Sequence, residues 1–288
     1  MRHLLVISLV TLASAFAQPQ ALIRSGKLAD ALVLYQDELK QNPDSPSANN
    51  GAGVVLDLMG RTAEAKKYFA KAIETAPNPQ AKANAQRAMA MSYAFDGDCA
   101  NTVKYNKMVF DHYVSTGDFY QQGEMANEAA RVCIDNGKLD EAEKWYRLGT
   151  EVGLKEPNIK PERVSLWHFR LEHALARLAA RRGNKAEAQK HIGAAKAILD
   201  KDAEMAKQQA IFFPYLLGYV ALYTGDPKTA LEELKKANQN DPFIQCLIGD
   251  TYEKLGDRDQ AKEYFKKASQ STAHNPPGAY ARRVTRNL

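Results

Sequence analysis

A recurring glycine organises the pattern of small, large and polar positions along the chain. Seven glycines, each between two stretches with helical periodicity, follow one another at intervals of 31 to 46 residues. These turn glycines are Gly26, Gly60, Gly97, Gly137, Gly183, Gly225 and Gly256. The spacing predicts a series of helix pairs, each joined by a tight turn, and it is typical of a repeat architecture.

Small residues recur at two fixed distances from the turn glycines. Five positions after each glycine stand Ala31, Ala65, Thr102, Ala142, Ala188, Ala230 and Ala261. Seven positions before all but the first stand Gly53, Ala90, Ala130, Ala176, Gly218 and Gly249. Small side chains at these positions allow the two antiparallel helices of a pair to approach closely where they cross.

Large residues and prolines complete the unit. Nine positions after six of the glycines stand Tyr35, Phe69, Tyr146, Ile192, Leu234 and Phe265, and the third unit has Asn106 instead. Seventeen positions after a glycine, Pro43, Pro77 and Pro242 end the second helix.

This pattern resembles the tetratricopeptide repeat (TPR) family, whose 34-residue unit is a helix, a tight turn and a second helix. Residues 46–79 fit best, with Gly53, Ala65, Phe69, Ala72 and Pro77 at the family's motif positions, and residues 211–242 and 242–273 follow closely. The resemblance covers nearly all of the chain after residue 17. It implies an all-α fold, a right-handed superhelical solenoid of about six to seven antiparallel helix pairs that bury their apolar faces against one another.

Departures from the repeat indicate where the array is divided. The first helix of the fifth unit runs back to about Glu162, after the breaks at Pro157 and Pro161. We therefore expect an N-terminal sub-array at 18–153, an elbow at 154–162 and a C-terminal sub-array at 163–273. A basic C-terminal tail is expected at 274–288, and because Pro276-Pro277-Gly278 cannot continue a helix, the part after it, Ala279 to Leu288, is expected to be mobile.

Residues 1–17 have the plan of a secretory signal peptide. Arg2 is followed by an apolar run from Leu4 to Leu12, and Ala15 and Ala17 place small residues at the −3 and −1 positions. The alternative, an uncleaved membrane anchor, is disfavoured because a span needs about 20 apolar residues. We expect cleavage before Gln18 and an exported protein, periplasmic in a bacterium or secreted.

Three cysteines, Cys99, Cys133 and Cys246, allow at most one internal disulfide, and their spacing fits no zinc site. One interpretation treats them as small buried hydrophobic residues. Another pairs Cys99 with Cys133, because the start of one unit's second helix and the end of the next unit's first helix lie at the same end of the stack. Pairing requires α-carbons within about 7 Å.

Charge is concentrated at one end of the chain. The 39 basic and 34 acidic residues give a net charge of +5, and all of this excess lies after Glu263. The neutral body lacks the basic stripe that a duplex binder needs, so we expect no nucleic-acid partner. A weaker hypothesis places Arg282, Arg283 and Arg286 of the tail on anionic lipid.

No catalytic or metal-binding pattern is present. His168 and His173 are five residues apart, which on a helix separates their rings by roughly 140° and prevents them from sharing a metal. There is no glycine-rich phosphate loop and no nucleophile elbow. The sequence predicts a protein with no cofactor, no metal and no enzymatic activity.

The resemblance implies that positions 13, 10, 6 and 3 before each turn glycine lie on the inner, concave face. The predicted partner-binding residues at these positions are Asn50, Asn84, Arg87, Asn127, Arg131, Arg170, His173 and Arg177. Asn can bond a peptide backbone on both its donor and acceptor sides, and Arg can bind carboxylates. We expect capture of an extended peptide or helix of an envelope protein, acidic or ending in a free carboxylate.

Two alternatives to this function follow from the same residues. In the first alternative, the inner face is a hydrated surface whose charges pair within the array. In the second, the protein is a structural assembly factor of an envelope or pilus-type machine and acts through its convex face or its ends. In the sixth and seventh units the inner positions carry aromatic residues such as Phe212, Tyr215, Tyr219 and Phe243. They accept an apolar partner or are buried, and burial is favoured because large exposed aromatic patches are unusual.

Overall fold

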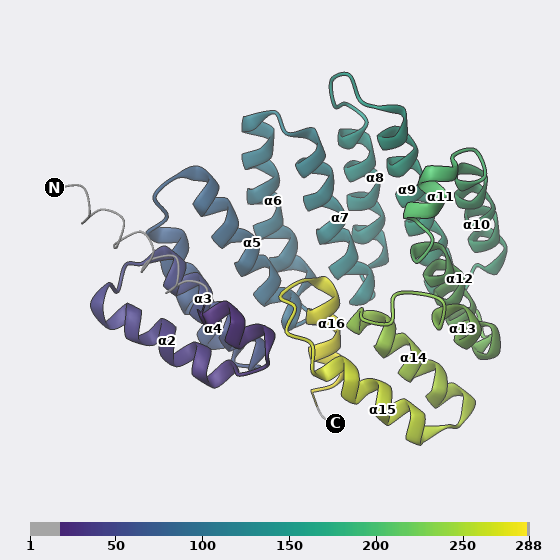
Figure 1. Ribbon diagram of the computed structural model, residues 1–288. Coiled ribbons are helices and arrows are strands. Elements are labelled where there is room, and N and C mark those ends of the chain that lie inside the picture. The colour runs from purple at the N-terminus through teal and green to yellow at the C-terminus, as the bar shows by residue number, and fades with distance from the viewer. Residues whose placement is uncertain (1–17, 287–288) are drawn as a thin grey trace.

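The computed structural model describes residues 18–286, and every regular element in that part of the chain is a helix (Figure 1). The predicted signal peptide, residues 1–17, lies outside the described residues. Residues 18–24 are helical, and the remaining helices are α2 Leu28–Gln41, α3 Pro46–Leu58, α4 Thr62–Glu74, α5 Pro79–Phe95, α6 Cys99–Thr116, α7 Phe119–Asp135, α8 Leu139–Gly153, α9 Pro161–Arg181, α10 Lys185–Leu199, α11 Ala203–Gln208, α12 Phe212–Tyr223, α13 Pro227–Leu234, α14 Pro242–Leu255, α15 Arg258–Ser269 and α16 Pro276–Val284.

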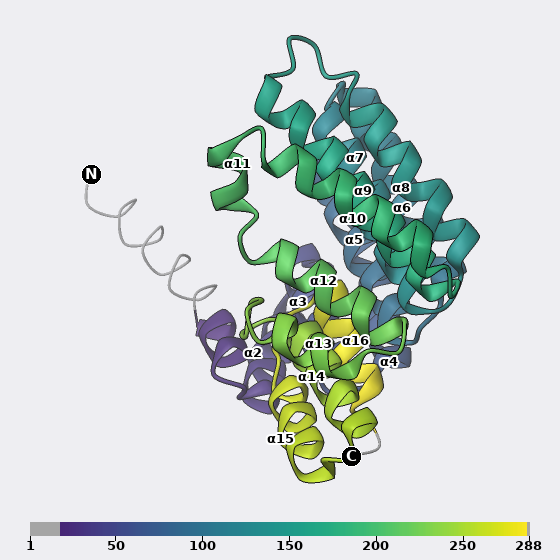
Figure 2. The same cartoon turned by 90° about the vertical axis from the view of Figure 1, so that its right-hand side faces the viewer.

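These helices form the antiparallel pairs that the repeat predicts. The pairs are 18–24 with α2, α3 with α4, α5 with α6, α7 with α8, α9 with α10, α12 with α13, and α14 with α15. Each pair packs on the next, so the array curves into an arc (Figures 1 and 2). The predicted all-α superhelical solenoid is confirmed. Helices α11 and α16 stand outside the pairing.

The turn glycines supply the backbone conformation that the tight turns require. All seven have positive φ, between 73° and 87°, a region that residues with a side chain rarely adopt. In the second unit the Arg61 N–H reaches back to the Leu56 carbonyl at 2.8 Å, which closes the end of α3. After four of the glycines, the second helix is capped at its N-terminus by a side chain. The capping residues are Asp98, Asn184, Asp226 and Asp257.

The small and large positions of a unit meet in the structure. A Cβ atom placed on Gly53 would lie 2.6 Å from the ring of Phe69, and one on Gly249 would lie 2.7 Å from the ring of Phe265. In the same way, a Cβ atom placed on Gly218 would lie 2.6 Å from the side chain of Leu234. The small residue on the first helix therefore makes room for the large residue on the second, and this is the physical cause of the repeat pattern.

In the third unit, polar side chains occupy the positions where the two helices cross. The hydroxyl of Thr102 donates to two main-chain carbonyls. Its oxygen lies 2.8 Å from the carbonyl oxygen of Asp98 and 3.2 Å from that of Ala90. Asn106 occupies the large position and is fully buried, and neither of its amide atoms has a partner among the described residues. This unit therefore packs less favourably than its neighbours, because an unpaired buried amide costs free energy.

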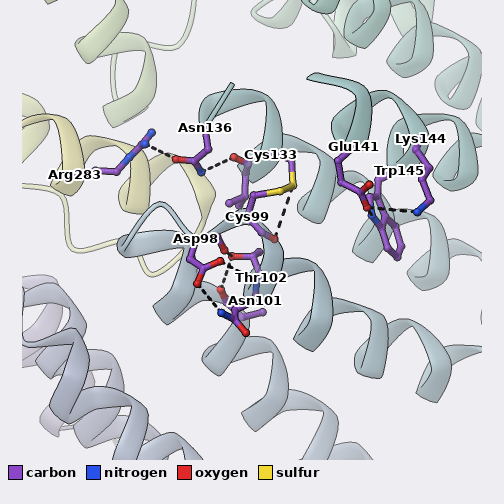
Figure 3. Close-up of a disulfide and its surroundings, with 12 residues drawn as sticks. Asp98, Cys99, Asn101, Thr102, Cys133, Asn136, Glu141, Lys144, Trp145 and Arg283 are labelled. Carbon is purple, nitrogen blue, oxygen red and sulfur yellow. Dashed lines mark hydrogen bonds and ion pairs between the residues drawn. A yellow bond between two sulfur atoms is a disulfide. The ribbon is translucent and has the colours of Figure 1, made fainter. Parts of the chain in front are cut away.

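A disulfide joins the third unit to the fourth. Cys99 at the start of α6 is bonded to Cys133 near the end of α7, with α-carbons 5.0 Å apart (Figure 3). The predicted pairing is confirmed. Cys246 is a buried free thiol in α14, and burial raises its pKa.

The predicted elbow coincides with the irregular segment between α8 and α9. Trp167 of α9 is fully buried and fills the space left by Gly123 of α7 and Gly153 of α8, where a Cβ would lie 2.4 Å and 2.2 Å from its ring. The contact of α9 with α7 and α8 is thus tightly packed at this tryptophan.

The expectation of a mobile C-terminal tail is wrong. Residues 276–284 form α16, which packs on the inner helices α5, α7 and α14 (Figures 1 and 2). Pro276 cannot continue a preceding helix but suits the first turn of a new one, and the Asn275 side chain accepts from the Gly278 N–H at 2.9 Å.

Several polar contacts hold this segment against the N-terminal half of the array. The His274 ring lies between Phe69 and Phe95, and its Nε2 is 2.8 Å from a carboxylate oxygen of the fully buried Asp57. The arginines expected to contact lipid bond within the molecule instead. Arg282 donates to the Ser271 carbonyl, Arg283 to Asn136 and to the Asp135 carbonyl, and Arg286 to the Phe95 carbonyl.

Within residues 18–286 no helix has the length and apolar character that crossing a membrane requires.

Candidate binding site on the inner face

The eight predicted partner-binding residues line two hollows on the inner face. The first, the N-terminal hollow, has a volume of about 380 Å³ and is lined by Asn50, Val54, Asn84, Arg87, Ala88, Met91, Glu128, His274 and Asn275. The second, the arginine pocket, has a volume of about 270 Å³ and is lined by Glu124, Asn127, Arg131, Tyr146, Leu166, Phe169, Arg170, His173, Arg177, Gln209, Phe212 and Tyr215. Helix α7 contributes to both, so the hollows are neighbours.

Helix α16 limits the part of the inner face that is open. It packs on residues at the carboxyl ends of α5 and α7, including Ala94, Val132 and Asp135. The residues of α5 and α7 that line the two hollows come earlier on these helices, and His274 and Asn275, just before α16, complete the N-terminal hollow.

The N-terminal hollow is polar, and its charges are partly paired. Arg87 forms an ion pair with Glu128 at 2.5 Å, in which 53% of the Arg87 side chain but only 9% of the Glu128 side chain is exposed. The side-chain oxygen of Asn50 is buried without a hydrogen-bond partner among the described residues. Asn84 accepts from Gln80 at 3.0 Å. The hollow thus offers a free acceptor beside an accessible guanidinium.

The arginine pocket is built around the buried side chain of Arg177. Only 5% of this residue is exposed. Its guanidinium donates to the hydroxyls of Tyr215 at 3.1 Å and Tyr146 at 3.0 Å, which come from α12 and α8. His173 lies one turn earlier on α9, with a ring nitrogen 3.2 Å from the Phe212 carbonyl. Burial, with Arg177 adding to it, lowers the pKa of His173 well below its ordinary value, so the ring is neutral at pH 7 and donates to that carbonyl.

Arg131 is the second cation of the pocket. Its guanidinium lies over the ring of Phe243 at 4.8 Å, and it has no hydrogen-bond partner among residues 18–286, the buried Nε included. Nearby, Asp135 has a buried carboxylate oxygen without a partner. Burial raises the pKa of Asp135 to about 6, and the surrounding arginines, Arg131 first, oppose that rise.

Positive charge is in excess in the arginine pocket. Arg170 at its edge pairs with Glu124. Neither Arg131 nor Arg177 lies within ion-pair distance of any carboxylate in the described part of the chain. Buried charges in proteins are normally paired, so a buried Arg177 and a half-buried Arg131, both without a carboxylate partner, are unusual.

The sequence placed the polar residues of both hollows on one face, but for the arginine pocket it missed Tyr146 and Phe169. Tyr146 stands at a position interpreted as packing, and its hydroxyl reaches the pocket. The inner aromatic residues Tyr215, Tyr219 and Phe243 are buried, as favoured, whereas Phe212 at the mouth of the pocket is 46% exposed. The sequence signal that pointed to this side of the pocket is the long connection between α10 and α12, which contains Gln209.

Comparison with known proteins agrees with this architecture. Residues 22–90 and 244–275 match two family profiles, both described as tetratricopeptide repeat. The chain therefore contains tetratricopeptide repeats in these two segments. The comparison with curated proteins gives no match.

Solved structures share the TPR fold at low sequence identity. A TPR protein from Parabacteroides merdae is 14% identical, with 89% of this chain and 91% of that chain covered and a TM-score of 0.54. The apo form of RapI is 12% identical, with coverages of 89% and 95% and a TM-score of 0.57. TPR-like repeats from Podosopora anserina are 17% identical, with coverages of 69% and 96% and a TM-score of 0.53.

The TPR fold is generally that of a protein-interaction module without catalytic activity. The described residues contain no group of three His, Cys, Asp or Glu side chains placed to hold a metal ion. The role of the eight inner-face residues in binding stays a prediction.

Proposed function

We propose that this TPR protein is a non-enzymatic module that binds a peptide or helix of an envelope protein on its inner face. The observation that carries the proposal is the clustering of the predicted residues. Side chains from four successive inner helices, α3, α5, α7 and α9, converge on two neighbouring hollows. Polar atoms there, such as Asn50 Oδ1 and the Arg131 guanidinium, have no partner among the described residues.

The proposed compartment is the cell envelope, periplasmic in a bacterium, or the outside of the cell. Residues 1–17 have the plan of a signal peptide. The disulfide between Cys99 and Cys133 supports this, because structural disulfides persist mainly in oxidising compartments.

The N-terminal hollow suits an extended acidic segment. The side-chain amides of Asn50 and Asn84 can bond the donor and acceptor sides of a peptide backbone. Arg87 keeps its pairing with the largely buried Glu128, and the exposed 53% of its side chain leaves guanidinium N–H groups open to a carboxylate of the partner. The N-terminal hollow therefore supplies both backbone and charge recognition.

The test is crosslinking capture from an envelope fraction, with residues 18–288 as bait and bound proteins identified by mass. The decisive variant is Asn84→Ala with Arg87→Gln. Arg177 is left intact because its replacement would leave two buried tyrosine hydroxyls unpaired. A partner identified with the unaltered bait is expected to be captured about ten-fold less by the variant, consistent with loss of one charge-assisted contact.

A matched control is available on the outer helix α8. Arg147 is 55% exposed and pairs with Glu143 at 2.7 Å, much as Arg87 pairs with Glu128. Arg147→Gln should leave capture unchanged. Capture that survives the Asn84 and Arg87 changes would move binding to the convex face or the array ends and contradict the proposal.

A further inference from the structure

We propose that the arginine pocket binds an organic carboxylate attached to an apolar or aromatic group. The inference goes beyond the proposed interaction function, because the pocket is a bounded site with its own chemistry. The carboxylate comes either from a free small acid or from the terminus of a peptide, and both present the same group to the pocket.

The first argument is the direction of the hydrogen bonds around Arg177. The hydroxyl oxygens of Tyr146 and Tyr215 both accept from its guanidinium. Neither hydroxyl donates to any residue in the described part of the chain, although both tyrosines line the pocket. Each phenol therefore retains a proton to donate, and donation from the cation polarises that O–H.

The second argument is Arg131, which provides further donors on the same site. Its guanidinium rests on Phe243, lines the pocket and has no partner among residues 18–286. A planar guanidinium presents paired N–H groups that match the two oxygens of a carboxylate. Arg131 with the two tyrosine hydroxyls thus forms a set of donors that converge on one hollow.

The third argument is that the charged acceptor of the pocket is already paired, while its uncommitted amides, Asn127 and Gln209, can donate as well as accept. Glu124 is paired with Arg170, and the Phe212 carbonyl faces a ring nitrogen of His173. Asp135 lies outside the lining and is opposed by several arginines. The unoccupied hydrogen-bonding capacity is mainly that of donors, and the net charge is positive, so the site favours an anion over a cation.

The fourth argument concerns the body of the ligand. Leu166 and Phe169 line the pocket beside the two tyrosine rings, and the exposed ring of Phe212 stands at its mouth. The volume of about 270 Å³ is at the small end for ligand pockets. These features fit a single aromatic or branched apolar group behind the carboxylate.

The experiment is calorimetric titration of the purified chain with 3-phenylpropionate and with its neutral analogue 3-phenylpropanamide. The acid is expected to bind at least about ten-fold more tightly than the amide, because only the acid carries the anion. This comparison uses the unaltered protein. Absence of acid binding together with absence of peptide-acid binding, or equal affinity for acid and amide, would overturn the proposal.

A variant then assigns the binding to Arg131. Arg131→Met keeps the length and apolar stem of the side chain, and it should weaken acid binding about ten-fold or more. Because Arg131 also offsets the charge of the Asp135 carboxylate, the free energy of unfolding is measured alongside, and loss of acid binding in a variant that still unfolds cooperatively assigns the site to Arg131. Unchanged acid affinity in Arg131→Met would contradict the assignment.

Two further titrations are needed. One identifies the source of the carboxylate, and the other distinguishes this proposal from the proposed function of the N-terminal hollow. Acetyl-Gly-Phe with a free terminus is compared with its terminal amide, and tighter binding of this peptide acid than of 3-phenylpropionate identifies a chain terminus as the source. The Asn84→Ala, Arg87→Gln variant alters the N-terminal hollow only, so it should bind the acid as the unaltered chain does. Failure of partner capture and failure of acid binding are therefore distinguishable.

Discussion

Single residues set how closely the two helices of a unit pack. Gly53 and Phe69 show this most directly, because the ring occupies the space that a side chain at position 53 would need. The reciprocal choice of a small and a large residue is repeated in the sixth and seventh units. A substitution at the small position is thus a steric change in a well-packed core.

Gly53→Ala is expected to lower the free energy of unfolding by about 1–3 kcal/mol, because its Cβ overlaps the Phe69 ring. Gly193 in α10 is the matched control, since a Cβ there meets nothing within 4 Å. Gly193→Ala should raise stability by about 0.5–1 kcal/mol through the lower backbone entropy of alanine. Urea unfolding followed by circular dichroism measures both, and equal effects of the two changes would contradict this account.

The half-buried carboxyl of Asp250 gives the protein a specific pH dependence. Burial, with Glu253 adding to it, raises the pKa of Asp250 to about 6, above the value of about 3.9 in an unfolded chain. Between these values the native state binds more protons, so the free energy of unfolding falls as pH rises from about 4 to about 6.

Asp250→Asn should remove this contribution, on the order of 2 kcal/mol across that range. The measurement is urea unfolding of both proteins at pH 4, 5, 6 and 7. Asp259→Asn, at an exposed position of α15, serves as the control. A stability difference between wild type and Asp250→Asn that stays constant with pH would contradict the prediction.

At the scale of elements, the disulfide strengthens the contact between the third and fourth units. It joins α6 to α7 across 34 residues of chain (Figure 3). Contacts in a repeat array are mainly between neighbours, so a crosslink at one interface stabilises that interface most. The less favourable packing around Asn106 lies in the same unit.

Reduction of this disulfide should lower the free energy of unfolding by about 3–4 kcal/mol, from the loop entropy released in the unfolded chain. Denaturation with and without a phosphine reductant measures the change. The Cys99→Ser, Cys133→Ser variant should resemble the reduced protein and be insensitive to the reductant. An unchanged midpoint in the reduced wild type would contradict the prediction.

At the scale of the whole molecule, α16 turns an open solenoid into a closed arc. The contact between His274 and Asp57 joins positions 217 residues apart, and Arg286 reaches the carboxyl end of α5. Helix α16 also packs on α14, so one short helix links both halves of the array. Nearest-neighbour stacking alone would leave those halves connected only along the chain.

Removal of residues 271–288 should therefore open the arc. We expect a larger radius of gyration in small-angle scattering and faster amide exchange at the carboxyl ends of α5 and α7, which lose their cover. His274→Ala removes one anchor while keeping α16, and it should produce a smaller change in the same direction. A truncated chain with an unchanged radius and unchanged exchange would contradict this role.

The candidate site was predictable in part. The repeat spacing put Asn84, Arg87 and Arg131 on one face, because each lies at a fixed distance from a turn glycine. It could not separate the exposed Arg87 from the buried Arg177, because burial depends on side chains from other units. The tyrosine hydroxyls that surround Arg177 come from α8 and α12, which no local pattern connects.

The sequence by itself determined the helix pairs and their tight turns, since these follow from contacts within a unit, and it allowed the pairing of Cys99 with Cys133, which the structure decided. Only the tertiary structure decided the fate of the C-terminal segment and the division of the inner face into two hollows. The physical reason is that curvature accumulates from small rotations at every unit interface. Whether residue 274 meets residue 57 depends on the sum of those rotations, which no single repeat encodes.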